Sequence, residues 1–198
     1  LASAGQGPFR QDVVVTAAAT PVELGTVTRT LTVITRDQIA GLPVNSIPDV
    51  LRLVSSVDVR ARGERGVQTD FAVRGANFGQ MLVLVDGVRL NDAQSGHHNG
   101  DIPVPLDAVE RIEILHGPGS SLFGADAFGG TINVITRQDA FPASGALQVG
   151  SVGAPGDIDH PAGFLVAGRG QVGVERGAVR QVLAASVDRS SGFMLERG

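Results

Sequence analysis

The sequence has no cysteine, no lysine, no tryptophan and no tyrosine, and these absences narrow the classes of protein that it can encode. Without cysteine, the chain has neither a structural disulfide nor a thiolate metal site. Without lysine, it lacks an essential residue of the P-loop, and no serine lies in a G-x-S-x-G nucleophile elbow. No apolar run approaches the roughly 20 residues of a membrane-spanning helix. Thiol chemistry, P-loop nucleotide binding and helical membrane insertion are therefore excluded.

The remaining composition fits a glycine-rich globular protein that does not bind nucleic acid. The chain has 198 residues, of which 42% are hydrophobic, enough for one sizeable core or two small ones. Its 27 glycines favour turns and bulges over long helices. The net charge is -4, and the 16 basic residues, all arginines, are scattered along the chain. A polyanionic partner is therefore not expected.

The most informative pattern lies in residues 109–137, where two strand-like runs flank a glycine-rich loop. In the first run, charged Arg111 and Glu113 alternate with isoleucines, and in the second Ile132 and Val134 alternate with polar residues. The loop has several glycines that permit positive φ, but neither a third fingerprint glycine nor a sustained helix follows it, so a dinucleotide site is not indicated. We predict a structural hairpin with turn glycines at Gly117, Gly124, Gly129 and Gly130.

This hairpin sequence, VERIEILHGPGSSLFGADAFGGTINVITR, resembles the end of the plug domain of TonB-dependent outer-membrane receptors, with its pattern ERIEVLRGP, a small-residue turn and GGxINIIT. A second family-like segment, VRGANFGQMLVLVDGVRLND at residues 73–92, places an Arg-Gly pair before an apolar strand and a tight turn. The structural turn residues in that segment are Gly75, Asp86 and Gly87. The two segments occur in the order and spacing of the family.

A third segment, DVVVTA, looks like the TonB box, which is offered to the energy-transducing partner in the periplasm. Its consecutive β-branched valines suit an edge strand added to the sheet of another protein. The alternative is an ordinary first strand of this domain. The docking interpretation predicts contact with the periplasmic C-terminal domain of TonB by the following residues: Asp12, Val13, Val14, Val15, Thr16 and Ala17.

Between these segments, the sequence predicts an α+β plug domain over residues 20–138, with a small mixed β-sheet, short helices and long loops, after a flexible leader at 1–19. Strands are expected at 31–34, 57–60, 71–74 and 81–85, the last as the buried central strand. Thr35 and Gln38 form a capping box for a helix that ends near Gly41. A second helix begins at Ser46 with an apolar stripe of Val50, Leu51, Leu53 and Val54.

After a linker at 139–144, residues 146–152, 164–175 and 179–189 alternate between apolar and polar positions. We interpret residues 139–198 as the first antiparallel strands of an incomplete transmembrane β-barrel, with a soluble antiparallel meander as the alternative. Plugged transporters have about 22 strands and aromatic girdles, so we expect most of the barrel to lie outside this sequence. We also expect the N-terminus to be truncated or processed.

Two polar loops are the predicted ligand-facing surfaces, since apical plug loops in the resembling receptors touch the captured ligand. A plain solvated loop is the alternative. A metal site at the histidine pair with Asp92 or Asp101 is disfavoured because neighbouring side chains diverge, so no metal is predicted. The ligand-facing residues are Arg62, Arg65, Gln68, Asn91, Gln94, Ser95, His97, His98 and Asn99.

The resemblance also implies that strand charges hold the plug against barrel-wall glutamates. The predicted lock residues are Arg74, Glu110, Arg111, Glu113 and His116. The last stands where the family has arginine. Since the unperturbed pKa of histidine is about 6.5, this variant of the lock is hypothesised to weaken above neutral pH.

Together, the resemblance implies a gate in the outer membrane that has no catalytic role and no cofactor. Its partners would be TonB with the inner-membrane energy-transducing complex, a small-molecule or metal-chelate ligand such as a ferric siderophore or cobalamin, and the membrane itself through the barrel. The alternative is a free-standing periplasmic binding or adhesion module with a plug-like fold. An enzyme of unknown reaction is a third interpretation.

Overall fold

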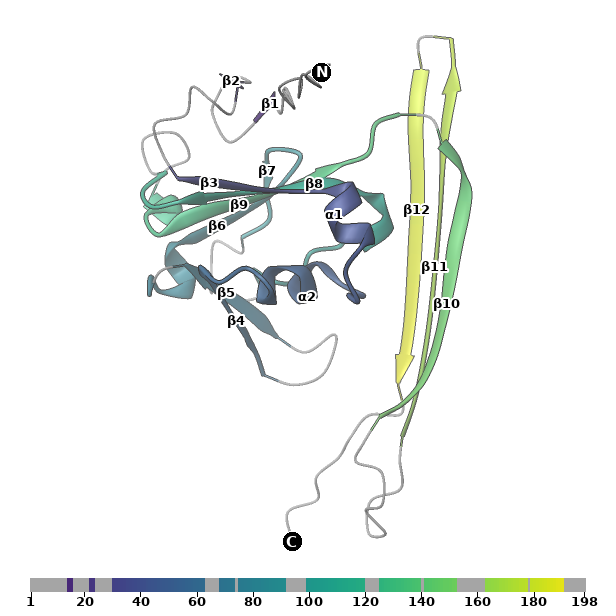
Figure 1. Ribbon diagram of the computed structural model, residues 1–198, viewed down its shortest axis with the longest axis horizontal. Coiled ribbons are helices and arrows are strands. Elements are labelled where there is room, and N and C mark those ends of the chain that lie inside the picture. Colours follow the sequence, from purple (N-terminus) through teal and green to yellow (C-terminus); the bar gives the residue numbers. More distant parts are fainter. Residues whose placement is uncertain are drawn as a thin grey trace, which may run out of the picture. The chain divides into compact units, whose positions relative to one another are not determined.

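The computed structural model divides into two compact units (Figure 1). The described residues are 14–15, 22–23, 30–62, 68–73, 75–91, 99–119, 125–139, 141–152, 163–177 and 179–190. Unit 1 comprises Leu1–Val44, Pro48–Ile102 and Glu110–Ile135. Unit 2 comprises Asn45–Ile47, Pro103–Val109 and Thr136–Gly198.

The main sheet is five-stranded and mixed, as predicted. Its order is β3 (Leu31–Thr35), β8 (Val109–His116), β9 (Gly130–Thr136), β6 (Met81–Val85) and β7 (Val88–Arg89). The β3–β8 and β6–β7 pairs are antiparallel, whereas β6 and β9 are parallel. The predicted central strand, β6, is interior but lies one position from the centre, which β9 occupies. Parallel pairing of distant segments caused this error, because local sequence patterns do not encode it.

The three interior strands of this sheet, β8, β9 and β6, are largely buried, whereas the edge strand β3 is half-buried and the edge strand β7 is exposed. Every residue of β9 except the last is buried, and so are the first four residues of β6. Leu82, Leu84 and Ala127 form one cluster of the core. Figure 1 shows helix α2 and the β4–β5 pair on one side of the sheet.

Two short helices begin where the sequence predicts. Helix α1 (Arg36–Ala40) has the capping box of Thr35 and Gln38 and ends at Gly41. Helix α2 (Ile47–Arg52) buries Val50 and Leu51. Leu53, however, is 59% exposed because the helix stops before it, so the predicted stripe was wrong at this residue. Among the described residues, no helix is long and apolar enough to cross a membrane.

Two small ladders complete unit 1. Strands β4 (Val57–Ala61) and β5 (Thr69–Val73) are antiparallel, and Phe71 is fully buried between them and the rest of the unit. Near the N-terminus, β1 (Val14–Val15) pairs with β2 (Val22–Glu23).

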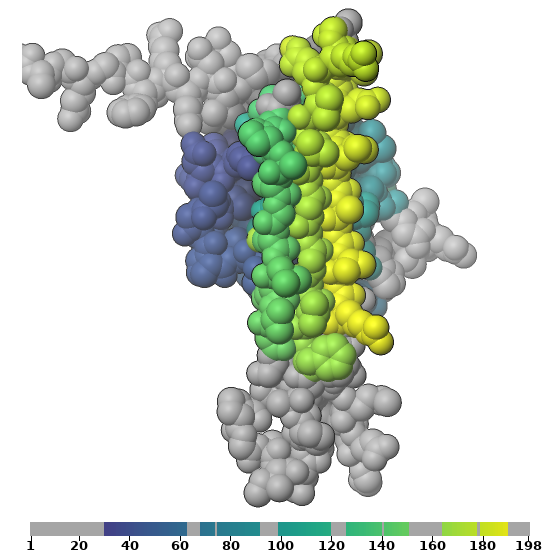
Figure 2. Space-filling view, turned by 90° about the vertical axis from the view of Figure 1, so that its right-hand side faces the viewer, coloured from purple at the N-terminus to yellow at the C-terminus, as the bar shows by residue number. Residues whose placement is uncertain are grey.

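Unit 2 contains three long antiparallel strands, β10 (Phe141–Val152), β11 (Gly163–Arg176) and β12 (Val179–Ser190). They lie side by side as one sheet (Figure 2). The predicted strands are confirmed, but β10 begins inside the stretch assigned to a linker. A register shift between Phe141 and Ser144 accommodates Pro142 there, so the linker is shorter than predicted.

Candidate functional site

The predicted lock charges of β8 contact each other inside the plug. Arg111 Nε lies 2.8 Å from Glu113 Oε1, and both side chains project from the same face of the strand. The Glu113 side chain is 0% exposed, against 21% for Arg111. A fully covered carboxylate cannot also contact a barrel wall in this conformation, so the lock prediction is corrected for Glu113. Glu110 is half-buried, and its place in the lock stays a prediction.

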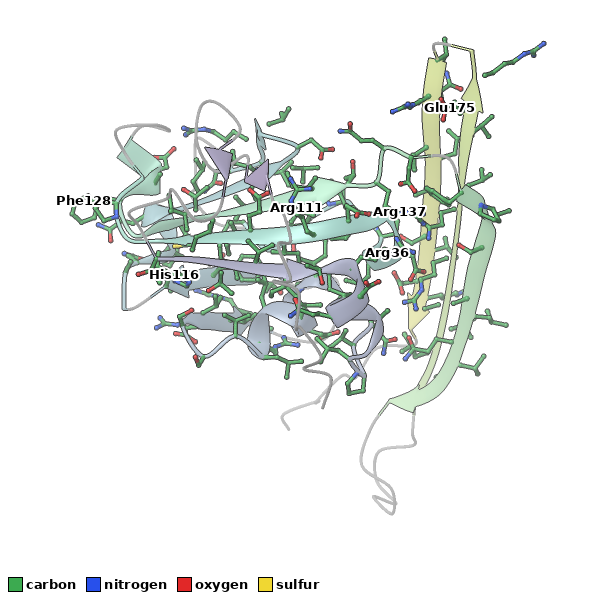
Figure 3. The ribbon with its side chains drawn as sticks, turned by 45° about the horizontal axis from the view of Figure 1, so that its top comes forward. Arg36, Arg111, His116, Phe128, Arg137 and Glu175 are labelled. Atoms are coloured by element: carbon green, nitrogen blue, oxygen red, sulfur yellow. The ribbon has the colours of Figure 1, made fainter. Side chains whose placement is uncertain are left out.

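His116, at the end of β8, is also an internal residue. It is 6% exposed, and its Nε2 lies 2.9 Å from Thr32 Oγ1 of the adjacent strand β3 (Figure 3). Its backbone N–H donates to Thr30 O. The imidazole therefore joins two strands of the sheet, and the wall contact expected from the family arginine is corrected. Arg74 lies outside the described residues.

The predicted tight turn between β6 and β7 is present and is held by β9. Asp86 and Gly87 have φ of 49° and 80°, as a two-residue hairpin with two left-handed positions requires. The Gly87 N–H donates to Asn133 Oδ1 at 3.2 Å, and the Asp86 N–H donates to Val134 O at 2.9 Å. Positive φ is also found at three other predicted turn residues, Gly75, Gly117 and Gly130.

The β8–β9 hairpin is antiparallel, and its turn is closely packed at Gly129. Gly117 donates to Gly129 O near the turn, and Arg137 donates to Ala108 O at the other end. A Cβ on Gly129 would lie 2.3 Å from Ala76 Cβ, so glycine is required there. Phe128 beside it is 60% exposed and projects from the turn (Figure 3). Gly124 lies outside the described residues.

Two predicted ligand-facing asparagines instead hold the backbone, because they flank strands whose edges need partners. Asn99 is 1% exposed; its Oδ1 accepts from Phe71 N and its Nδ2 donates to Phe78 O. Asn91 accepts from Val83 N at 2.7 Å and donates to Met81 O at 2.6 Å. The ligand-facing prediction is therefore corrected for both residues.

Other members of the predicted ligand surface are less constrained. Arg62 is exposed and closes the β4–β5 ladder through its backbone N–H to Gln68 O, while Gln68 Nε2 donates to Asp70 Oδ2. The remaining members lie outside the described residues: Arg65, Gln94, Ser95, His97 and His98. Within the part of the chain that the structure describes, no three potential ligands gather at a metal site.

The predicted docking segment coincides in part with β1. Val14 pairs with Glu23, and Val15 pairs with Val22. These two valines therefore have the extended backbone that strand addition needs. The other four members, Asp12, Val13, Thr16 and Ala17, lie outside the described residues.

Unit 2 contains two side-chain contacts, one between distant and one between nearby residues, that the sequence pattern does not predict. Arg169 Nε of β11 lies 2.5 Å from Asp107 Oδ2 in the 3-10 turn Leu106–Ala108. The guanidinium of Arg137 lies over the Phe141 ring, 3.4 Å from its centroid. The Arg-x-x-x-Phe spacing alone was no signal for such a stack.

The three strands of unit 2 have one apolar and one polar face. In the register of the sheet, even positions of β11 align with odd positions of β10 and β12. The aligned side chains on this face include eight exposed large hydrophobics: Leu147, Val149, Phe164, Val166, Val174, Val179, Leu183 and Val187. The opposite face has Arg169, Gln171 and Glu175.

A small mixed sheet followed by long amphipathic antiparallel strands is the arrangement expected of a receptor plug and the start of its barrel, and comparison with known proteins agrees. Residues 23–131 match the model of the TonB-dependent receptor plug domain family. The chain therefore belongs to the TonB-dependent receptors.

Three relatives illustrate this assignment. The vitamin B12 transporter BtuB of Vibrio vulnificus (strain CMCP6) is 40% identical over 77% of this chain and 24% of its own length. The iron-regulated outer membrane virulence protein of Vibrio cholerae (classical Ogawa strain O395) is 36% identical over 80% of this chain and 25% of its own. The crystal structure of the siderophore receptor PirA from Acinetobacter baumannii is 25% identical, with a TM-score of 0.59 over 82% of this chain and 25% of that one. The chain thus spans about a quarter of the length of these relatives, one of which is named as a transporter and another as a receptor.

Proposed function

We propose that this chain forms the plug and first barrel strands of an outer-membrane receptor that actively takes up a scarce ligand such as a ferric siderophore or cobalamin. The observation that carries the proposal is the continuity of a family plug sequence with a sheet whose outward chemistry suits lipid. The names of the relatives, a vitamin B12 transporter and a siderophore receptor, support this ligand class.

The dimensions of the apolar face support the location in a membrane. Along β11, Phe164 and Val174 bound this face, ten residue steps apart. At about 3.3 Å per residue they are about 33 Å apart, and a tilt of about 40° reduces this to about 25 Å, the height of the apolar band of outer-membrane barrels. Arg176 follows the band at one end of β11, and its partner Val179 begins β12.

The proposed division of the chain follows from these roles. Residues 1–19 are a leader with the TonB-docking segment at 12–17, residues 20–138 are the plug, and residues 139–198 begin the barrel. We assign ligand contact to the loops that contain Arg62, Gln68 and the pair His97 and His98. The plug would block the pore until TonB, driven by the inner-membrane complex, rearranges it.

Uptake by the full-length receptor tests the function. Cells that depend on this receptor should accumulate labelled cyanocobalamin or an iron-loaded siderophore, and deletion of TonB should abolish accumulation. Lack of TonB-dependent uptake of any cobalamin or siderophore would contradict the proposal.

A proline variant tests the docking segment. Val14→Pro should abolish both uptake and co-purification with the periplasmic C-terminal domain of TonB, because proline removes a main-chain donor from the added strand. Ala19→Pro, outside the proposed segment, is the matched control and should retain both. Equal loss in the two variants would contradict a docking role for residues 12–17.

A further inference from the structure

The ends of the plug hairpin belong, by their contacts, to the unit of the first barrel strands. Residues Pro103–Val109 lead into β8 and include its first residue, and Thr136 is the last residue of β9; the first group and the residues from Thr136 onward both cluster in unit 2. The Arg137 N–H donates to Ala108 O at 2.9 Å, so the two ends are joined by a backbone hydrogen bond. This bond closes the β8–β9 hairpin at the end away from its glycine turn.

One contact holds the first of these ends to β11. The Asp107 carboxylate lies 2.5 Å from Arg169 Nε, and the side chains are 33% and 27% exposed. Arg169 stands on the polar face of β11, between its register partners Ala146 and Ser186. Partial burial reduces the screening of this ion pair by salt. Small neighbours on both sides leave the guanidinium free to reach the turn.

A stacked contact holds the second end. The Arg137 guanidinium covers one side of the Phe141 ring, and Gly173, the register partner of Phe141, lies against that ring. A Cβ on Gly173 would lie 2.6 Å from Phe141 Cδ1 and 2.6 Å from Asp139 O. The glycine thus creates the space into which the ring packs. Phe141 is 8% exposed, so the stack excludes water.

We propose that these five residues form a fixed anchor, which attaches the plug hairpin to the barrel wall and stays closed while the rest of the plug moves. The anchor residues are Asp107, Arg137, Phe141, Arg169 and Gly173. The inference rests on the proposed uptake function. It goes beyond that function by assigning which end of the plug does not move.

The anchor consists of two chemically different contacts on two chain segments. Breaking one contact should therefore weaken the backbone hydrogen bond that joins the two segments. Breaking the ion pair frees the turn Leu106–Ala108, and the Arg137 amide then loses the support of its acceptor, Ala108 O. Exchange of the Arg137 amide hydrogen therefore reports whether the anchor is closed.

Hydrogen exchange of the purified full-length receptor tests the contacts independently of uptake. In Asp107→Arg and in Arg169→Asp, the peptide that contains the Arg137 amide should exchange about tenfold faster, because attraction is replaced by repulsion. The double variant Asp107→Arg/Arg169→Asp should restore protection of this peptide, and the conservative variant Arg169→Lys should retain it. Arg180→Asp, which disturbs the Glu175–Arg180 ion pair on the same sheet face, should leave this peptide unchanged. Unchanged exchange in the single swaps, or acceleration spread equally over β11 and β12 in the swap and control variants, would overturn the anchor.

Chemical bridging tests whether the anchor stays closed during uptake. The chain has no cysteine, so Asp107→Cys/Arg169→Cys introduces one reactive pair into these residues. A bifunctional methanethiosulfonate should bridge the pair in cells, with TonB-dependent uptake of the probe that the wild type accepts, cyanocobalamin or iron-loaded enterobactin, unchanged. Uptake lost on bridging and recovered on reduction would overturn the fixed anchor. Absence of uptake in the wild type would instead contradict the proposed function, while the exchange experiment still decides whether the anchor exists.

Discussion

Strands β9 and β11 have similarly alternating sequences, but β9 is covered on both faces whereas β11 is exposed on its apolar face. In β9, polar Thr131 and Asn133 are buried together with Ile132 and Val134, so both faces of the strand are covered. In β11, Val166 and Val174 are exposed while Gln171 is buried. Strand alternation therefore identifies two faces, but the surroundings decide which face is covered. Large apolar side chains on an exposed face are expected where that face meets lipid in place of water.

The largest effect is expected in the fully covered strand. Ile132→Ala should destabilise the plug by about 2–5 kcal/mol, because it leaves a cavity in a core that cannot collapse fully. Ile132 is 0% exposed on the central strand β9. Denaturant unfolding of the full-length receptor, followed by hydrogen exchange of β9, measures the loss. The control Val88→Ala truncates a side chain that is 68% exposed and should change stability little. Equal losses would mean that burial does not distinguish these sites.

Charge insertion on adjacent residues of β10 should separate the two sheet faces. Leu147 is 74% exposed on the apolar face, opposite Gly168 near the middle of the band. Leu147→Arg should cost about 2–4 kcal/mol of barrel stability in the membrane, whereas Gln148→Arg on the polar face should cost little. The heat-modifiable electrophoretic mobility of the receptor, which distinguishes folded from unfolded barrels, measures the difference. If the two variants assemble equally well, the apolar face does not contact lipid.

Alanine substitution of polar loop residues should have a smaller effect on stability, and this effect should distinguish residues that hold the backbone from residues that face the ligand. Asn91→Ala should lower plug stability by about 1–3 kcal/mol, because Val83 N–H and Met81 C=O lose their side-chain partners. Arg62→Ala changes an exposed side chain and should stay within about 0.5 kcal/mol. Binding of cyanocobalamin or an iron-loaded siderophore should respond in the opposite order. Reduced affinity in Asn91→Ala at unchanged stability would restore the original ligand-facing prediction for that residue.

The helices, strands and tight turn could be predicted because their signals are local. The capping box at Thr35 and Gln38, the Asp86–Gly87 turn and the strand alternation each depend on neighbouring residues. The family resemblance added the plug and the start of the barrel. Residue roles were predicted less well, because a side chain's partner can be distant in sequence. His116 contacts Thr32 across 84 residues, and nothing near either residue indicates it.

Asn91 and Asn99 show the same limit in the loops. Loop composition predicts polar side chains near the surface, but unpaired strand edges compete for the same amides. Leaving a buried backbone N–H or C=O without a hydrogen bond costs free energy in the folded plug. The asparagine amides therefore bond to the backbone instead of facing a ligand. The site was therefore predictable as a set of loops, and the roles of its individual residues were not.

The smallest effect is expected from glycine substitutions that change backbone strain without changing packing. They test the turn between β6 and β7. Gly87 and Gly79 both have open space where a Cβ would be, with no atom within 4 Å, but only Gly87 has positive φ, at 80°. Gly87→Ala should therefore destabilise the plug by about 1–2 kcal/mol through strain alone. Gly79→Ala, which meets neither a clash nor a left-handed backbone, should be neutral or slightly stabilising because it restricts the unfolded chain. Thermal unfolding of both variants measures the difference. Similar melting temperatures would show that the turn relaxes at no cost, and that Asn133 and Val134 do not hold its geometry.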